Sequence, residues 1–449
     1  MRVVVIGGGI TGLAAAWELQ RHPSRPDVTL LEAADRLGGK IRTTPFAGLP
    51  AVDEGADAFL ARVPWATELC AELGIDDLVA PATGRAYVWW DHRMHRIPDG
   101  LVLGVPKGLG GLARSGLMSW RGKARAAIEP LVPRRPTTDA LGATIRYRFG
   151  AEVLERLVGP LVGGINAGDA DRLSLAATTP QLAEAAGRSR SLLLALRRTP
   201  PAPAGPVFLA PSGGMQTLVD ALVARLDGVD MRLGQPASAV AADGSGWRVD
   251  DQPADAVIVT TPAWATVRLL ETASPDAARL LTGIDHASVA LVTLAFDERH
   301  VARSLDGSGH LVPKAAQRHI TACSWGSTKW TGWKREDQVI LRASLGRDGD
   351  VHALEGDDDD AVAMAVADLA DQLGIGGDPL HQRVSRWERS FPQYRPGHNE
   401  RVAAIADALR RDADGVVATG AAFGGLGIPA CIRQGREAAR AALARAAAR

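Results

Sequence analysis

The sequence has few cysteines and no excess of charge of either sign. Its three cysteines, Cys70, Cys323 and Cys431, lie far apart and form no CxxC or Cys/His cluster. They therefore predict free thiols in a reducing compartment rather than a zinc or disulfide site. The 51 Lys and Arg residues equal the 51 Asp and Glu residues, so the formal net charge is zero. Because a neutral chain offers no general field for a phosphate backbone, we expect no nucleic-acid partner.

Long hydrophobic runs are also missing. No apolar run approaches the roughly 18 residues that a membrane-spanning helix needs, and residues 289–295, among the longest runs, suit a buried strand. The first residues lack a basic segment followed by a small-residue cleavage site, so we expect a mature chain that starts at Met1. These features favour a cytoplasmic protein with at most peripheral membrane contact.

The side-chain patterns that mark the common catalytic centres are absent as well. No Ser/His/Asp, Cys/His or metal-ligand arrangement is visible, so we predict neither a catalytic residue nor a metal ligand. The acidic run at residues 357–360 is typical of a helix N-terminus, where negative charge is favourable. This absence fits chemistry that is carried by a bound cofactor.

A glycine-rich turn near the N-terminus has the context of a nucleotide site. Residues 3–6 predict a strand, residues 13–21 a helix and residues 28–31 a second strand. Gly7, Gly9 and Gly12 supply G-x-G-x-x-G between the first strand and the helix. Such glycines permit a tight turn, close approach of a pyrophosphate and close helix packing. Glu32, twenty residues past Gly12, is placed to bind a ribose hydroxyl, so we predict dinucleotide binding.

The residues after Glu32 indicate which dinucleotide is bound. A second double glycine, Gly38 and Gly39, is followed by Lys40 and Arg42. A nicotinamide cofactor has no need of this second turn, whereas a cofactor buried along its full length does. The stretch resembles the double-glycine signature of FAD-dependent amine-oxidase-like enzymes. The resemblance implies FAD, with a nicotinamide dehydrogenase as the alternative.

The C-terminal segment and the middle of the chain carry a more specific resemblance. Residues 419–435 resemble the C-terminal flavin motif of the porphyrinogen oxidases. Further stretches look like the oxygen-dependent protoporphyrinogen/coproporphyrinogen III oxidase family, in order along the chain: residues 52–60, 96–100, 160–169, 173–175, 213–218, 321–325, 329–330, 392–394 and 397–398. Residues 321–325 with Lys329 and Trp330 resemble its soluble bacterial branch, which oxidises coproporphyrinogen III.

This resemblance implies a function and partners. The implied reaction is the six-electron oxidation of coproporphyrinogen III to coproporphyrin III in haem biosynthesis, with dioxygen as acceptor and hydrogen peroxide as product. A ferrochelatase is an expected recipient of the product. The alternatives are oxidation of protoporphyrinogen IX, oxidation of an amine or polyene by another amine-oxidase-like flavoenzyme, and a binding protein of the same fold without activity. The intact Gly7, Gly9, Gly12 and Glu32 argue against the last.

The family motifs imply site residues in this chain. The implied FAD contacts are Gly7, Gly8, Gly9, Ile10, Thr11, Gly12, Glu32, Ala33, Lys40, Gly55, Ala56, Asp57, Ala58, Ala237, Ala421, Leu426, Gly427 and Ile428. Family members often have valine at the position of Ala237, but a backbone contact survives the smaller side chain. The implied macrocycle contacts are the backbone of Gly164 and the side chains of Ile165 and Asn166. Arg62 and Lys107 are candidates to pair with the substrate propionates, because a carboxylate in a partly dry pocket needs a charged partner.

The expected fold is α/β, with a discontinuous Rossmann-like FAD-binding domain, a mixed-sheet substrate domain and a helical insertion. Residues 1–80, 201–265 and 396–449 are expected to form the FAD-binding domain. Residues 81–200 should supply substrate-domain strands and the insertion, and residues 266–395 the substrate-binding sheet. The proline-rich residues 199–206 predict a linker, and residues 65–78 predict a helix. Arginines such as Arg114, Arg121, Arg134 and Arg135 make the insertion basic, which favours a solvated face over a lipid-contact surface.

Overall fold

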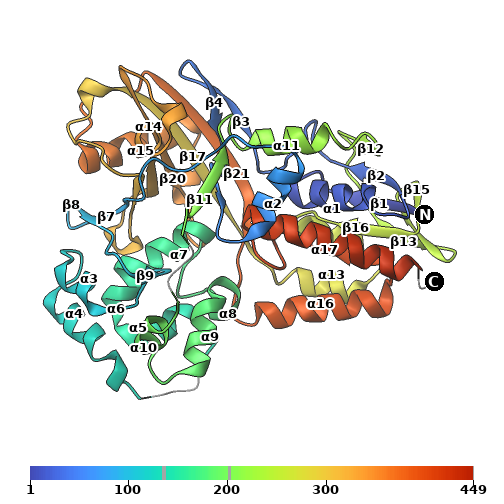
Figure 1. Cartoon of the computed structure of the whole chain (residues 1–449), viewed down its shortest axis with the longest axis horizontal. Coiled ribbons are helices and arrows are strands. Elements are labelled where there is room, and N and C mark those ends of the chain that lie inside the picture. The colour runs from blue at the N-terminus through green and yellow to red at the C-terminus, as the bar shows by residue number, and fades with distance from the viewer. Residues whose placement is uncertain (134–137, 201–203, 448–449) are drawn as a thin grey trace.

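A computed structural model of the chain describes residues 1–133, 138–200 and 204–447. It has two main sheets and a block of short helices, arranged side by side (Figure 1). Arg134 and Arg135 of the basic set, and residues 201–203 of the predicted linker, lie outside the described residues. Among the helices of the described part, none is long and apolar enough to cross a bilayer.

The first sheet is parallel throughout and contains the N-terminal strand at its centre. Its strand order is β12, β2, β1, β16 and β22. Their bounds are Val229–Arg232, Asp27–Leu31, Arg2–Ile6, Ala256–Val259 and Val416–Ala418, respectively. Strands far apart in the chain thus become neighbours. The predicted βαβ unit is present as β1, helix α1 (Ile10–Gln20) and β2.

Helices and a small sheet cover the two faces of this first sheet. Val3 and Val5 of β1 pack against α1, α2 (Pro64–Glu72), α11 (Gln216–Val223) and α17 (Ile428–Ala447). Val4 and Ile6 face the opposite side, because side chains alternate along a strand. That side is covered by the following elements: β13 (Val240–Asp243), β14 (Gly246–Val249), β15 (Gln252–Ala254), α12 (Ala263–Leu270), α13 (Pro275–Leu281) and α16 (His398–Asp412).

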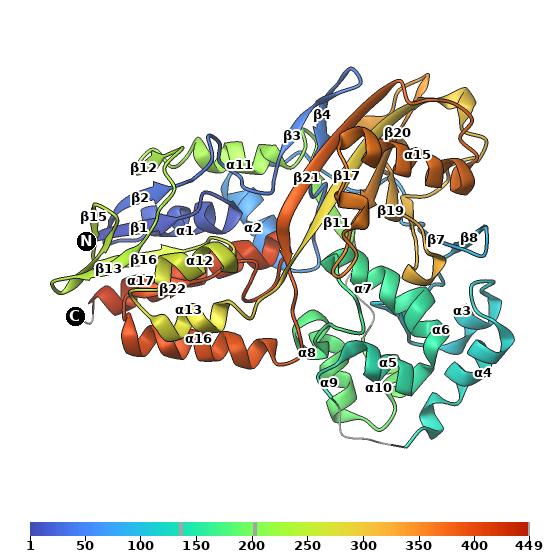
Figure 2. The ribbon, with the colours of Figure 1, turned by 180° about the vertical axis from the view of Figure 1, so that it is seen from behind.

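The second sheet is mixed and has seven strands. In order these are β21 (His381–Pro392), β17 (His286–Asp297), β20 (Gln338–Leu345), β19 (Ile320–Trp325), β18 (Gly309–Leu311), β7 (Tyr87–Trp90) and β8 (Arg93–Arg96). Only the β18–β7 pair among the pairs of this sheet is parallel. Helix α15 (Asp358–Leu373) covers one face (Figure 2). The acidic run is its N-terminus, as predicted, where Asp357 and Asp360 form a capping box.

The predicted helical insertion is a cluster of short helices with its own apolar core. Its helices are α3 (Leu109–Arg114), α4 (Trp120–Ala127), α5 (Leu141–Phe149), α6 (Ala151–Val153), α7 (Gly159–Asn166), α8 (Leu175–Thr178), α9 (Pro180–Arg188) and α10 (Leu192–Arg197), with a π-helical turn at Leu154–Val158. Short strands complete the chain: β3 (Thr43–Phe46), β4 (Leu49–Asp53), β5 (Phe59–Leu60), β6 (Leu78–Val79), β9 (Leu101–Val102), β10 (Val105–Pro106) and β11 (Phe208–Pro211), together with α14 (Gly326–Lys329). The predicted α/β fold is confirmed.

The helix predicted over residues 65–78 is too long. Helix α2 ends at Glu72, and Leu78 already belongs to strand β6. The reason is Gly74, whose φ of +68° is a left-handed conformation that a helix cannot continue through.

Candidate functional site

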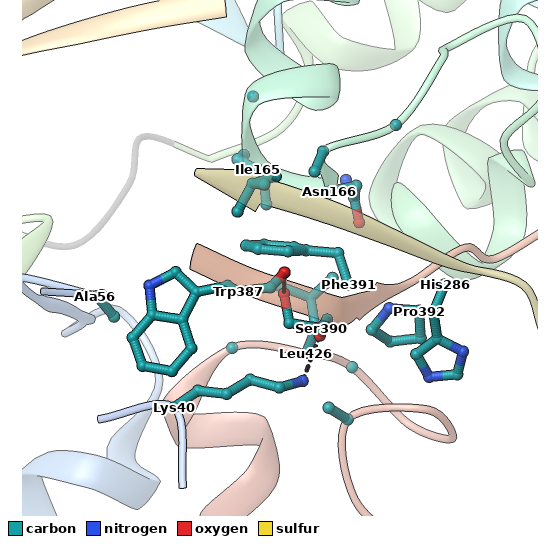
Figure 3. A pocket seen from close by; sticks show the side chains of 18 of the residues that line it. Lys40, Ala56, Ile165, Asn166, His286, Trp387, Ser390, Phe391, Pro392 and Leu426 are labelled. Carbon is teal, nitrogen blue, oxygen red and sulfur yellow. Dashed lines mark hydrogen bonds between the residues drawn. The ribbon is translucent and has the colours of Figure 1, made fainter. Parts of the chain in front are cut away.

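One large cavity runs between the two sheets and the helical block. Its volume is about 1720 Å³, larger than the roughly 300–1,000 Å³ typical of a pocket for one small ligand. It is lined by the N-terminal glycine turn, residues 38–41, helix α7, strands β17 and β21, and residues 421–431. Figure 3 shows Lys40, Trp387 and Leu426 on one side of this space and Ile165 and Asn166 on the other. The cavity therefore has room for a dinucleotide and a second molecule.

The glycine turn forms one end of the cavity. Gly7 has a φ of +106°, and Gly9 is the N-cap of α1. A Cβ on Gly12 would lie 1.9 Å from the carbonyl oxygen of Gly7, so this helix start tolerates no side chain there. A Cβ on Gly9 would meet nothing closer than 4.0 Å. Gly9 thus leaves space in front of the positive end of α1, where a pyrophosphate binds favourably.

The carboxylate of Glu32 lies beside this turn. Its Oε2 accepts a hydrogen bond of 2.6 Å from the backbone N–H of Gly8, and its Oε1 accepts one of 2.8 Å from that of Ala34. Two backbone donors orient the group at the cavity wall, next to Ala33 and Ala237. Because a carboxylate has further lone pairs, Glu32 retains capacity to accept ribose hydroxyls.

The second double glycine packs on the first. Gly38 pairs with Gly9 in a parallel bridge, and its φ is +101°. A Cβ on Gly39, whose φ is +57°, would lie 3.1 Å from the Cα of Gly9. The two loops approach closely only without side chains, which is the structural reason for this pair of motifs in one chain.

Lys40 brings a positive charge to the cavity from the end of this loop. Its Nζ donates a hydrogen bond to the carbonyl oxygen of Ser390, drawn as a dashed line in Figure 3. Burial lowers the pKa of the Lys40 ammonium. The side chain thereby joins the nucleotide end of the cavity to strand β21.

A second helix N-terminus meets the cavity from the other end of the chain. Leu426 and Gly427 line it, and α17 begins at Ile428. A Cβ on Gly435 would lie 2.1 Å from the carbonyl oxygen of Thr11, so α17 crosses α1 in close contact. Two positive helix ends therefore face one space, which favours an anionic ligand group. Together with the glycine cradle and Glu32, these residues fit FAD.

Asp57, a predicted FAD contact, is engaged by other residues of the chain. It does not line the cavity, although Gly55, Ala56 and Ala58 do. Its Oδ2 lies 2.7 Å from Nζ of Lys329 and 3.1 Å from Nη2 of Arg342. Burial alone would raise the pKa of Asp57, but these two positive charges and their hydrogen bonds outweigh burial and hold the pKa well below its usual range. The Asp57 carboxylate therefore has a structural role, because it links its own segment to Lys329 and Arg342.

Helix α7 forms the opposite wall of the cavity. A Cβ on Gly164 would come within 3.6 Å of Leu311, and the Ile165 side chain is 52% exposed toward open space. Asn166 donates from Nδ2 to the carbonyl oxygen of Val162 at 2.8 Å, so its amide is tied to its own helix. Figure 3 shows Trp387 and Phe391 of β21 across from Ile165 and Asn166. The space between these walls is lined mainly by apolar atoms.

Arg62 and Lys107, the predicted propionate partners, lie outside the cavity lining. Nη2 of Arg62 donates to the carbonyl oxygen of Gly205 at 3.1 Å, and Lys107 belongs to the β10–α3 connection. Gly8 and Gly12 are likewise behind the lining, where they shape the turn. Among the residues that the structure describes, the cations that do line the cavity are Lys40, Arg146, Arg268, Lys314, Arg342 and Arg347. Of these cations, only Lys40 belongs to a sequence motif that predicts a ligand contact.

One histidine lies in the described part of this wall. His286 lines the cavity, and burial lowers its pKa to about 4, so it is neutral at ordinary pH. Within the described residues, no group of three or more His, Cys, Asp and Glu side chains could hold a metal ion.

The fold and the cavity define a protein that binds a dinucleotide beside a second, apolar chamber. Residues 10–443 match the flavin containing amine oxidoreductase family, to which this chain belongs. The family confirms FAD as the cofactor.

Two relatives and one solved structure are similar over nearly the whole chain. The coproporphyrinogen III oxidase of Bacillus subtilis (strain 168) is 37% identical over 461 residues, covering 98% of this chain and 97% of that protein. The coproporphyrinogen III oxidase of Staphylococcus aureus (strain NCTC 8325 / PS 47) is 32% identical, covering 98% and 99%. The crystal structure of a provisionally assigned protoporphyrinogen oxidase from Exiguobacterium sp. 255-15 superposes with a TM-score of 0.87 at 31% identity, covering 98% of each chain. The predicted family resemblance is confirmed.

Proposed function

We propose that this protein is an FAD-dependent oxidase that converts coproporphyrinogen III to coproporphyrin III. The observation that carries the proposal is the continuous cavity that joins the glycine cradle to the chamber beneath α7. The names of the two bacterial relatives support the substrate, because both align with nearly the full chain. Bound FAD supplies hydride acceptance from the substrate, and dioxygen is the proposed final acceptor. The oxidation removes six electrons and six protons in three rounds, each of which reduces one dioxygen to hydrogen peroxide.

The chain's own residues hold the reactants and exclude water. The positive ends of α1 and α17 and the Lys40 ammonium stabilise negative charge on the cofactor side. Gly164 and Ile165 contact one face of the macrocycle, and Phe391 and Trp387 border the other side of the chamber. We assign no catalytic base, and the pyrrole protons leave to water. The FAD and macrocycle contacts implied by the family motifs, and the boundaries of the five segments, remain part of this proposal.

The setting is proposed to be the cytoplasm, with at most peripheral membrane contact and product handover to a ferrochelatase. The three cysteines support a reducing compartment, because all three are buried free thiols. Protoporphyrinogen IX is the alternative substrate, favoured by the name of the Exiguobacterium structure.

The test is aerobic turnover of anaerobically prepared porphyrinogens by the FAD-loaded protein. Porphyrin fluorescence and peroxide are followed with coproporphyrinogen III and with protoporphyrinogen IX. A higher kcat/KM for coproporphyrinogen III, with three peroxides for each porphyrin, supports the proposal. Preference for protoporphyrinogen IX selects the alternative substrate, and oxidation of neither by a flavin-bound protein refutes the function.

A further inference from the structure

The six cations of the described cavity lining differ in how well their charges are matched. Lys40 donates to a carbonyl oxygen, Arg146 binds both oxygens of Asp171 at 2.7 and 2.8 Å, and Lys314 lies 2.8 Å from Asp169. Arg342 pairs with Asp57 and donates to a backbone carbonyl. Arg268 is exposed to solvent on α12. Arg347 is the exception among the buried cations.

Arg347 is 9% exposed and has weak partners. Its closest carboxylate belongs to Asp350, 3.4 Å from Nε, in a geometry that makes no hydrogen bond. Within the described part of the chain, its guanidinium donates no side-chain hydrogen bond, and the Nε atom is fully buried. Burial lowers the pKa of Arg347, but a guanidinium stays charged at any ordinary pH. A buried charge without hydrogen-bonding partners is costly, so this group is suited to an incoming anion.

The loop that carries Arg347 is anchored to the wall of the substrate chamber. Gly346, with a φ of +84°, makes the turn after β20. The backbone N–H of Asp348 donates to the carbonyl oxygen of Ala167 at 2.7 Å, directly after α7. The Asp348 carboxylate is held by Arg172 at 3.0 Å and by Arg395 at 2.7 Å. Arg347 is therefore held rigidly beside the end of the helix that carries Gly164 and Ile165.

We propose that Arg347 is a substrate-binding residue that forms a two-point hydrogen bond with one propionate carboxylate of the macrocycle. The inference rests on the proposed function and names the specificity contact of that same site. A porphyrinogen bordered by α7 brings its edge groups toward the end of the helix, where Arg347 lies. The fork of the guanidinium matches both oxygens of a carboxylate. Asp350, whose side chain is 43% exposed, is free to turn to solvent when the propionate takes its place.

The test measures binding of coproporphyrin III and of its uncharged tetramethyl ester to the FAD-loaded protein, by quenching of porphyrin fluorescence. We expect Arg347→Gln to weaken coproporphyrin III binding by about 10- to 100-fold and to leave ester binding within about twofold. Arg347→Lys keeps the charge but loses the forked guanidinium, so its affinity for coproporphyrin III should lie between those of the wild type and Arg347→Gln. Arg279→Gln, at an exposed arginine of α13, is the control. Arg146→Gln is the comparison for a cavity arginine whose carboxylate is already provided.

The outcomes separate this inference from the proposed function. An Arg347→Gln protein that retains FAD and binds coproporphyrin III like the wild type overturns the inference, as does an equal loss for the ester. An equal loss in Arg146→Gln also overturns it, because the effect would then come from the general positive field of the cavity. If the wild-type protein oxidises no porphyrinogen, the proposed function fails on its own measurement. FAD content and Tm of each variant show whether it has a folding defect. If Arg347→Gln has one, the binding of coproporphyrin III and of its ester by Arg347→Lys tests the inference instead.

Discussion

The ammonium of Lys329 lies 2.7 Å from a carboxylate oxygen of Asp57, which is 272 residues earlier in the chain. The same oxygen accepts a hydrogen bond of 3.0 Å from Nε1 of Trp330. This contact joins the wall formed by residues 55–58 to the seven-stranded sheet. Because both line the cavity, a buried ion pair between distant segments holds two of its walls together.

Replacement of Asp57 by Asn should destabilise the protein. It leaves the charges of Lys329 and Arg342 buried without their carboxylate, and loss of one partner of a buried pair costs about 3–5 kcal/mol in free energy of unfolding. Chemical denaturation of the FAD-loaded protein measures this change. Asp276→Asn, which removes exposed pairs with Arg279 and Arg411, should change stability by about 1 kcal/mol or less. Equal stabilities for the two variants would contradict a structural role for Asp57.

Two glycines of the same turn should respond differently to alanine. Gly9→Ala has space for its methyl group, so the fold should persist, but the methyl occupies the place of the cofactor and FAD affinity should fall at least about tenfold. Gly12→Ala forces a methyl group against the Gly7 carbonyl and should lower stability as well. Flavin absorbance after gel filtration and the Tm of the FAD-free proteins distinguish the two. A Gly9→Ala protein with normal FAD content would contradict the placement of the cofactor.

Gly164→Val should impair the substrate side alone. The added side chain projects from α7 into the chamber, with Leu311 as its nearest neighbour. We expect normal FAD content and a KM for coproporphyrinogen III that rises about tenfold or more, because the macrocycle loses its close contact with the helix backbone. Gly187→Val on α9, where a Cβ meets nothing within 4 Å, controls for the cost of valine in a helix. An unchanged KM in Gly164→Val would place the macrocycle elsewhere.

Stability should fall between neutral and mildly acidic pH. Burial lowers the pKa of His286, His310 and His398 to about 4, whereas histidine in an unfolded chain has a pKa of about 6.5. The unfolded chain therefore binds more protons between these values, and the free energy of unfolding decreases as pH falls from about 6.5 to about 4. The slope is at most about 1.4 kcal/mol per pH unit for each histidine.

Denaturation across this pH range tests the histidine prediction. His286→Asn removes one of the three buried imidazoles, so the slope of the free energy of unfolding against pH should fall by the contribution of that histidine. His352→Gln, which removes a side chain that is 83% exposed, should leave the slope unchanged. A stability that is flat across this range would contradict the buried neutral state of the three imidazoles.

The cofactor end of the site was predictable from sequence because its constraints are local. Gly7, Gly9 and Gly12 act within one turn: Gly7 and Gly12 leave no room for a side chain, and Gly9 keeps the space in front of the helix open. The pairing of Gly38 with Gly9 extends the same argument across one βαβ unit. Residues 426–428 were predicted as cofactor contacts only from the resemblance to the family. Nothing in their local sequence pattern indicates that they lie close to α1.

The charges of the site were not predictable in the same way. Arg146, Lys314 and Arg347 come from three separate segments, and none belongs to a motif that marks a ligand. Arg62 and Lys107 are close to family motifs in sequence but outside the cavity lining, because neighbouring residues of a loop or strand end face different ways. Asp57 lies within a cofactor motif, yet partners almost 300 residues away occupy its carboxylate. Burial and distant pairing decide these roles, and both require the fold.

The close crossing of α1 and α17 has a consequence during synthesis of the chain. The helix that opens the nucleotide cradle is made first, and the helix that completes it follows about 400 residues later. At translation rates of about 5–20 residues per second, about 20–80 s pass between synthesis of the N-terminal βαβ unit and synthesis of α17. During this interval the face of α1 around Thr11 and Ala15, both buried in the finished protein and in contact with α17, lacks that cover. A nascent chain that stops before residue 428 should therefore be a chaperone client that cannot retain flavin.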